Sequence, residues 1–148
     1  MRTNPRSGSP LWRRLALSLA CSAFASTGPS AVAGPDTASD GAPSFSHTIQ
    51  PIFNANCVAC HQSAGASGGL DLEEGTAYAS IVSRNSQASA FARITPGKPD
   101  ESYLVRKLEG THVQAGGSGE RMPPTGPLDS ALIGAIRAWV QAGARNDP

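Results

Sequence analysis

The chain has few aromatic side chains, only 5% of its 148 residues, while it holds 16 glycines and 12 prolines. A core built from protein side chains of this composition is thin, because a small domain buries a smaller share of its surface than a large one. This scarcity favours a bound apolar cofactor that fills the core, although it does not indicate which one.

Beyond the first 33 residues the sequence has neither a long apolar segment nor an excess of basic charge. Those 33 residues are typical of a secretory signal peptide: they combine four arginines, an apolar run at 15–25 too short to span a bilayer, and a small-residue cleavage site at 31–33. Cleavage after Ala33 removes four of the 12 basic side chains and leaves 8 against 11 acidic ones, a formal charge of −3. That balance excludes a strongly basic, nucleic-acid-binding surface.

The leader predicts a protein that is exported to the periplasm or secreted, with no transmembrane segment in the mature chain. Two alternatives stay open, a twin-arginine signal at Arg13 and Arg14 and a lipid anchor at Cys21, and the residues around both fit those patterns poorly. Residues 34–43 are small and polar and predict a flexible tail. Residues 44–148 then form one small domain, which we expect to be a monomer.

The sequence also lacks the alternating apolar pattern of β-strands and any internal repeat, so we predict an all-α domain of three or four short helices with long loops. The first helix starts at a serine N-cap, Ser44 or Ser46, and Pro51 requires that it begin late or kink. Its apolar residues recur at helical spacing: Phe45, Ile49, Ile52 and Phe53.

Three more helices are predicted downstream. A short one covers 76–83, and another starts with Asp100 as N-cap and ends at Gly110. The last runs from the N-cap Asp129 to Gly143. Its apolar stripe consists of Leu132, Ile133, Ile136, Trp139 and Val140. Between the last two helices, residues 111–127 are rich in glycine and proline and form a long loop, a kind of segment that is usually functional in a compact domain.

Cysteine is scarce as well: after the leader only Cys57 and Cys60 remain, and His61 follows them. Two cysteines three positions apart lie on one side of a helical turn, where both thiols can bond to the vinyl groups of a haem. The imidazole that follows can then ligate the iron, and C-x-x-C-H is typical of c-type haem attachment. We therefore predict one covalent haem c per chain, with its iron bound by His61.

Three other interpretations of these cysteines are weaker. A disulfide across so short a loop would stabilise the fold little. Thioredoxin-like chemistry uses C-x-x-C on a βαβ scaffold, of which the sequence gives no sign. A zinc site would need a fourth ligand, and there is no second C-x-x-C.

Met122 is the only methionine after the leader, and it lies in the long loop. A methionine thioether is a common second iron ligand and raises the reduction potential. Pro123 and Pro124 would stiffen the loop behind it. His112, at the start of the same loop, is the rival ligand, whereas we expect His47 to be a surface residue.

Several segments, taken in their order and spacing, resemble the small monohaem c-type cytochromes, and in particular the planctomycete-type cytochrome c domains. They are F-x-x-x-I-x-P-I-F before C-x-x-C-H, then T-P-G-K-P-D-E-S-Y-L-V-R-K-L, R-M-P-P and I-R-A-W-V-Q-A-G-A, which together span Phe45 to Ala144. The resemblance implies an all-α cytochrome c-like fold around a haem bound covalently to Cys57 and Cys60. It also implies His61 as proximal and Met122 as distal ligand.

The first functional hypothesis is therefore a periplasmic monohaem c-type cytochrome that passes single electrons between transient redox protein partners. It is not itself an enzyme under this hypothesis, although it could be the cytochrome subunit of a larger oxidoreductase. The alternative is a haem enzyme subunit or small-ligand sensor with an open sixth iron position. A third hypothesis is a disulfide-bonded binding module without haem. The sequence separates the first two only through Met122.

Overall fold

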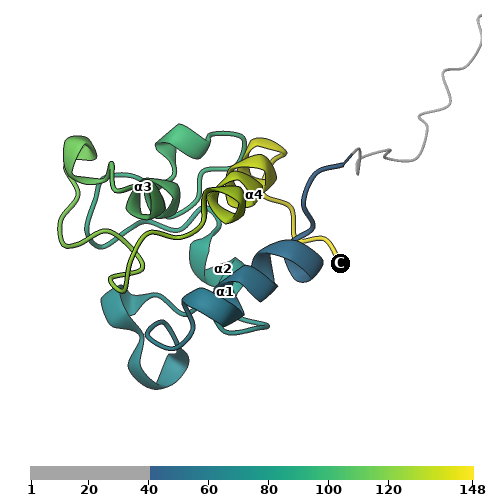
Figure 1. Cartoon of the computed structure of the whole chain (residues 1–148), viewed down its shortest axis with the longest axis horizontal. Helices are drawn as coiled ribbons and strands as arrows, with labels where there is room; N and C mark the ends of the chain where they lie inside the picture. Colours follow the sequence, from purple (N-terminus) through teal and green to yellow (C-terminus); the bar gives the residue numbers. More distant parts are fainter. Residues whose placement is uncertain (1–40) are drawn as a thin grey trace, which may run out of the picture. The chain divides into compact units, whose positions relative to one another are not determined.

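The computed structural model describes residues 41–148, so the predicted leader at 1–33 and most of the predicted tail at 34–43 lie outside the described residues. The described part is helical, as predicted, and contains no strand; it has two isolated β-bridges, between Val82 and Ile94 and between Asn85 and Ala92. Its α-helices are α1 (Gln50–Asn56), α2 (Ala77–Ile81), α3 (Tyr103–Glu109) and α4 (Ser130–Gln141) (Figure 1).

The first predicted helix divides into two parts at its proline. A π-helical turn, Phe45–Ile49, begins with Ser44 as N-cap, whose hydroxyl accepts a hydrogen bond from the His47 amide at 3.2 Å. The α-helix α1 then starts at Gln50, which places Pro51 in its first turn, where a missing amide hydrogen costs no helical bond. The expected apolar residues are all buried: Phe45, Ile49, Ile52 and Phe53.

The predicted N-cap at Asp100 is wrong. Pro99–Glu101 forms a single 3₁₀ turn, and α3 starts after Ser102, which is fully buried. The carboxylate of Asp100 is instead 2.7 Å from Arg137 on α4, and the hydrogen bond and charge of that guanidinium lower the pKa of Asp100. Because Arg137 also reaches Glu109 at 2.8 Å, one side chain of α4 connects both ends of the α3 segment.

The core forms where α4 meets the start of the domain. Trp139 is 1% exposed, and its ring lies 5.4 Å from that of Phe45 and 6.5 Å from that of Tyr78. The last helix therefore packs on the first helical segment. Of the predicted stripe on α4, Ile136 and Val140 are buried as well. Leu132 and Ile133, nearer the N-terminus of the helix, are half-buried.

Both ends of α4 follow the prediction. The carboxylate of Asp129 accepts a hydrogen bond from the Ala131 amide at 2.7 Å, as an N-cap should. Gly143 follows the helix with a φ of 101°, a conformation that favours glycine. Similarly, Gly110 ends α3 with a φ of 78°, so the terminators read from the sequence are confirmed.

Candidate functional site

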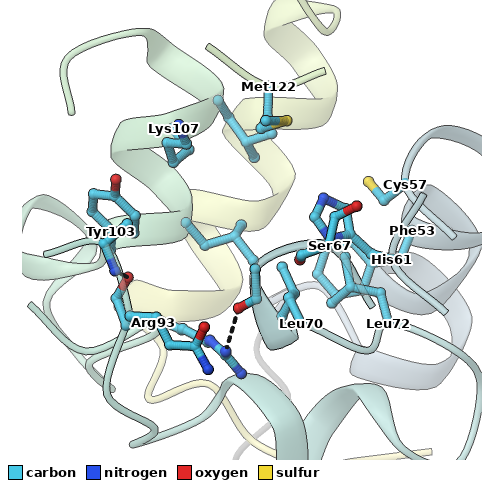
Figure 2. A pocket seen from close by; sticks show the side chains of 16 residues that line it. Phe53, Cys57, His61, Ser67, Leu70, Leu72, Arg93, Tyr103, Lys107 and Met122 are labelled. Atoms are coloured by element: carbon cyan, nitrogen blue, oxygen red, sulfur yellow. Dashed lines mark hydrogen bonds between the residues drawn. The ribbon is translucent and has the colours of Figure 1, made fainter. Parts of the chain in front are cut away.

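A largely apolar hollow lies between the end of α1, one side of α3 and the loop before α2 (Figure 2). Its cavity volume is about 250 Å³. This is close to the lower end of the range of about 300–1,000 Å³ that is usual for small-molecule and cofactor pockets. Its apolar lining includes Phe53, Leu70, Leu72, Leu104 and Leu108. Its charged lining residues, Arg93 and Lys107, are both basic.

The predicted attachment motif lies at one wall of this hollow. Cys57 is the C-cap of α1, and its amide donates to the Phe53 carbonyl at 2.9 Å. The chain then turns tightly, because the amides of Cys60 and His61 both donate to the Cys57 carbonyl at 3.1 Å. Cys57 and His61 line the hollow, while Cys60 is exposed and is not part of the lining. Both thiols are free.

The imidazole of His61 is held through one of its two ring nitrogens. Nδ1 lies 3.0 Å from the carbonyl oxygen of Ser67. Because a carbonyl oxygen only accepts, Nδ1 carries the proton in this bond, and Nε2 keeps its lone pair free. Metal-ligating histidines usually bind through one nitrogen while the other donates in this way. His61 is therefore oriented as a metal ligand would be.

Met122 reaches the same hollow from the long loop. Its amide donates to the Lys107 carbonyl at 3.0 Å, which ties this point of the loop to α3. Figure 2 shows Met122 beside Lys107, and His61 beside Cys57, on different walls. The structure thus brings together Cys57, His61 and Met122, three of the four predicted site residues.

The loop that leads to Met122 is joined to α3 by side-chain hydrogen bonds that run in both directions. The ammonium of Lys107 donates to the carbonyl oxygens of Ser118, at 3.0 Å, and Glu120. Arg121 in turn donates through Nε to the Leu108 carbonyl at 2.7 Å. The predicted loop at 111–127 is therefore held against α3, and it includes one 3₁₀ turn, Val113–Ala115.

The rival ligand, His112, points elsewhere. Its side chain is buried, and its Nε2 lies 2.7 Å from the Gly119 carbonyl, to which it donates. His112 packs edge-on against Tyr103, with the ring centroids 6.5 Å apart, and does not line the hollow. His47 is exposed on the π-helical turn. The structure therefore places Met122 at the hollow together with Cys57 and His61, and places neither His112 nor His47 there.

Gly117 gives a test of how tightly this loop packs. A Cβ built there would lie 2.5 Å from Tyr103 and 2.8 Å from the His112 carbonyl. We expect Gly117→Ala to lower the free energy of unfolding by about 1–3 kcal/mol, the usual cost of overpacking, as measured by urea unfolding. The control is Gly134→Ala on α4, where a Cβ meets nothing within 4 Å, and this variant should be stabilised by about 0.5–1 kcal/mol. Equal effects of the two variants would contradict the packing.

The two cysteines differ in their surroundings. Burial raises the pKa of the Cys57 thiol to about 11, while Cys60 is exposed. The thiolate is the reactive form, so at about pH 8 only about one Cys57 thiol in a thousand is reactive. In protein made without haem attachment, we expect iodoacetamide to modify Cys60 and spare Cys57, as read by mass spectrometry of peptides. Both should react in denaturant, and equal modification in the folded protein would contradict the burial of Cys57.

Comparison with known proteins found one match, to a protein family. Residues 57–126 match the family model described as Planctomycete cytochrome C. The match starts at Cys57 and includes α2, α3 and Met122, and it supports a planctomycete-type cytochrome c-like domain in this stretch. A cytochrome c domain implies haem. No curated protein and no solved structure matches the chain.

The sequence did not reveal Arg93 and Lys107 as residues of the hollow. Arg93 stands in no motif, and Lys107 lies in the T-P-G-K-P-D-E-S-Y-L-V-R-K-L segment, which assigned it no role. The groups that these two side chains contact lie 11–25 positions away along the chain. The only available signal was that both are basic residues beside apolar segments, which is common on any surface. The predicted site residues were recognisable because their identities and spacing carry the chemistry.

Proposed function

We propose that the protein is a periplasmic monohaem c-type cytochrome that transfers single electrons. The observation that carries the proposal is the arrangement of His61: its Nδ1 is bound to the Ser67 carbonyl, and it lines an apolar hollow together with Cys57 and Met122. The match of residues 57–126 to a cytochrome c family supports the same function.

The residues present fit a haem. Cys57 and Cys60 supply two free thiols for thioether bonds, and His61 offers the unprotonated Nε2. Apolar side chains line the hollow, as the burial of a macrocycle requires, and Met122 provides a thioether among them. When bound, haem iron supplies a centre that cycles between the ferric and ferrous states. The chain's own part would be to hold the group through Cys57, Cys60, His61 and Met122 and to exclude water from it.

The proposal extends to partners and location. We propose that the chain acts as an electron carrier and not as an enzyme, that it meets redox proteins transiently, and that its first 33 residues direct it to the periplasm. Within residues 41–148, none of the helices has the length and apolar character needed to cross a membrane. The alternative function, a small-ligand sensor or enzyme subunit, requires that Met122 leave the sixth iron position open.

Absorption spectra of the exported protein, made with a c-type maturation system, test the proposal. We expect haem that resists acid extraction, low-spin bands, and the weak long-wavelength band of sulfur-to-iron charge transfer. Met122→Ala should lose that last band, whereas the control His112→Gln, which keeps a donor for the Gly119 carbonyl, should retain it.

The other outcomes are equally distinct. A charge-transfer band that survives Met122→Ala would show that Met122 is not the ligand. A high-spin spectrum in the unchanged protein would favour the sensor or enzyme. The complete absence of covalent haem would overturn the proposed function.

A further inference from the structure

Arg93 holds together three parts of the chain beside the hollow. It lies between the two bridge residues Ala92 and Ile94, and its side chain is half-buried in the wall of the hollow. One terminal nitrogen of its guanidinium, Nη2, donates to the carbonyls of Gly68 at 3.1 Å and Gly69 at 2.9 Å. The other, Nη1, donates to the Ser80 carbonyl on α2 at 2.9 Å. Figure 2 marks one hydrogen bond of this guanidinium with a dashed line.

The turn to which Arg93 donates these hydrogen bonds has little stability of its own. Ser67–Gly69 is a single 3₁₀ turn with no buried residue, and Gly68 and Gly69 both have positive φ, at 66° and 62°. Glycine-rich backbone has many alternative conformations in solution, and ordering it costs conformational entropy. Contacts from outside the turn must therefore keep it in place, and the guanidinium supplies two of them.

The same turn carries the hydrogen-bond partner of the His61 imidazole. The Ser67 carbonyl, which directly precedes Gly68, accepts the hydrogen bond from His61 Nδ1 at 3.0 Å. That bond fixes which ring nitrogen carries the proton and how the imidazole is rotated. Because Ser67 and Gly68 are neighbours in the chain, a contact that fixes the Gly68 carbonyl also helps to fix the Ser67 carbonyl and, through it, the His61 imidazole.

We propose that Arg93 is a positioning residue for His61, acting through the Ser67–Gly69 turn. This inference rests on the proposed function, since it gives His61 the role of iron ligand. A planar guanidinium with several donors in fixed directions reaches three carbonyls at once. A lysine ammonium has the same charge but no such fork, and its single nitrogen cannot reach Ser80 and the turn together. The shape of Arg93 therefore matters as well as its charge.

A second role competes for the same side chain. Arg93 lines the hollow, so its charge could pair with a carboxylate of the cofactor. The two roles predict different effects of the substitution Arg93→Lys. If Arg93 acts through its charge, Arg93→Lys keeps that function and Arg93→Met loses it. If it acts through its hydrogen bonds to the turn, both variants lose that function.

The test is proton NMR of the ferrous holoprotein, which reads the exchange rate of the His61 Nδ1 proton with solvent. We expect exchange about tenfold faster in both Arg93→Lys and Arg93→Met, because the bond to Ser67 opens more often once its turn is free. Arg84→Met is the matched control: Arg84 donates from Nε to the Ala79 carbonyl on α2 at 2.9 Å, but it is exposed and does not line the hollow. Its exchange rate should equal that of the unchanged protein.

Thermal unfolding of each variant identifies a temperature at which all of them are folded, and the exchange rates are compared there. If Arg93→Met does not fold, the exchange rate of Arg93→Lys alone is compared with that of the unchanged protein. An unchanged exchange rate in Arg93→Lys would overturn the positioning role. If the reduction potential then moved in Arg93→Met alone, Arg93 would be a charge partner of the cofactor. Failure of the proposed function looks different, because covalent haem would then be missing from the unchanged protein and from Arg84→Met as well.

Discussion

A chain in which Cys57 and Cys60 are both replaced by serine will carry no covalent haem after export in a strain with a c-type maturation system. The thiols form the only covalent bonds that the proposed attachment uses, and serine hydroxyls do not form thioethers. The measurement is haem staining of the denatured protein after electrophoresis, which detects only haem that is covalently held. We expect complete loss of the signal.

The matched control is Cys21→Ser, which removes the third cysteine of the chain and lies in the predicted leader. This variant should stain like the unchanged protein. Single replacements discriminate further, because either remaining thiol could still hold the group by one bond, so we expect a reduced but detectable signal from each. Full staining of the double variant would contradict attachment at this motif.

Replacing Trp139 by alanine will cost about 3–5 kcal/mol of the free energy of unfolding, the usual range for truncating a buried large aromatic residue. Its ring is 1% exposed and packs against Phe45 and Tyr78. Its Nε1 also donates to the Arg145 carbonyl at 2.9 Å, so the truncation leaves that carbonyl without this donor. Urea unfolding followed by circular dichroism measures the loss.

Two variants calibrate this result. Trp139→Phe keeps an aromatic ring but loses the donor to the Arg145 carbonyl. Its free energy of unfolding should lie between that of the unchanged protein and that of Trp139→Ala. Leu132→Ala, on the half-buried part of the same helix, should cost clearly less than Trp139→Ala, since less apolar surface returns to water. A larger loss for Leu132→Ala would mean that the core is not centred on Trp139.

The helices were predictable because their signals are local. Apolar residues at helical spacing identified the first and last helices, and cap residues within a few positions, such as Ser44, Asp129 and Gly110, marked where they begin or end. The motif around Cys57 was equally local. Each of these features is determined by a stretch of fewer than about twenty residues, a length at which sequence periodicity is informative.

The remaining features depend on contacts between distant segments. Asp100 has the right identity for an N-cap, yet its carboxylate pairs with Arg137, 37 positions further along the chain. Arg93 contacts a turn 24 and 25 positions before it. No spacing rule encodes such pairs, because tertiary packing decides which side chain meets which carbonyl. The sequence could therefore name the candidate ligands but not the residues that position them.

The two ends of the helical domain are joined, and this has a consequence for when the domain can form. The amide of Phe45 donates to the carboxylate of Asp147 at 2.8 Å, and the hydroxyl of Ser44 donates to the Pro148 carbonyl at 2.7 Å. These partners are 102 and 104 positions apart, and contacts of such separation form late. If the first 33 residues direct the chain to the periplasm, as we propose, the N-terminus crosses the membrane first, and Cys57 and Cys60 are exposed before Trp139 arrives to complete the core. The delay gives an attachment enzyme time to reach both thiols while the chain around them is still open.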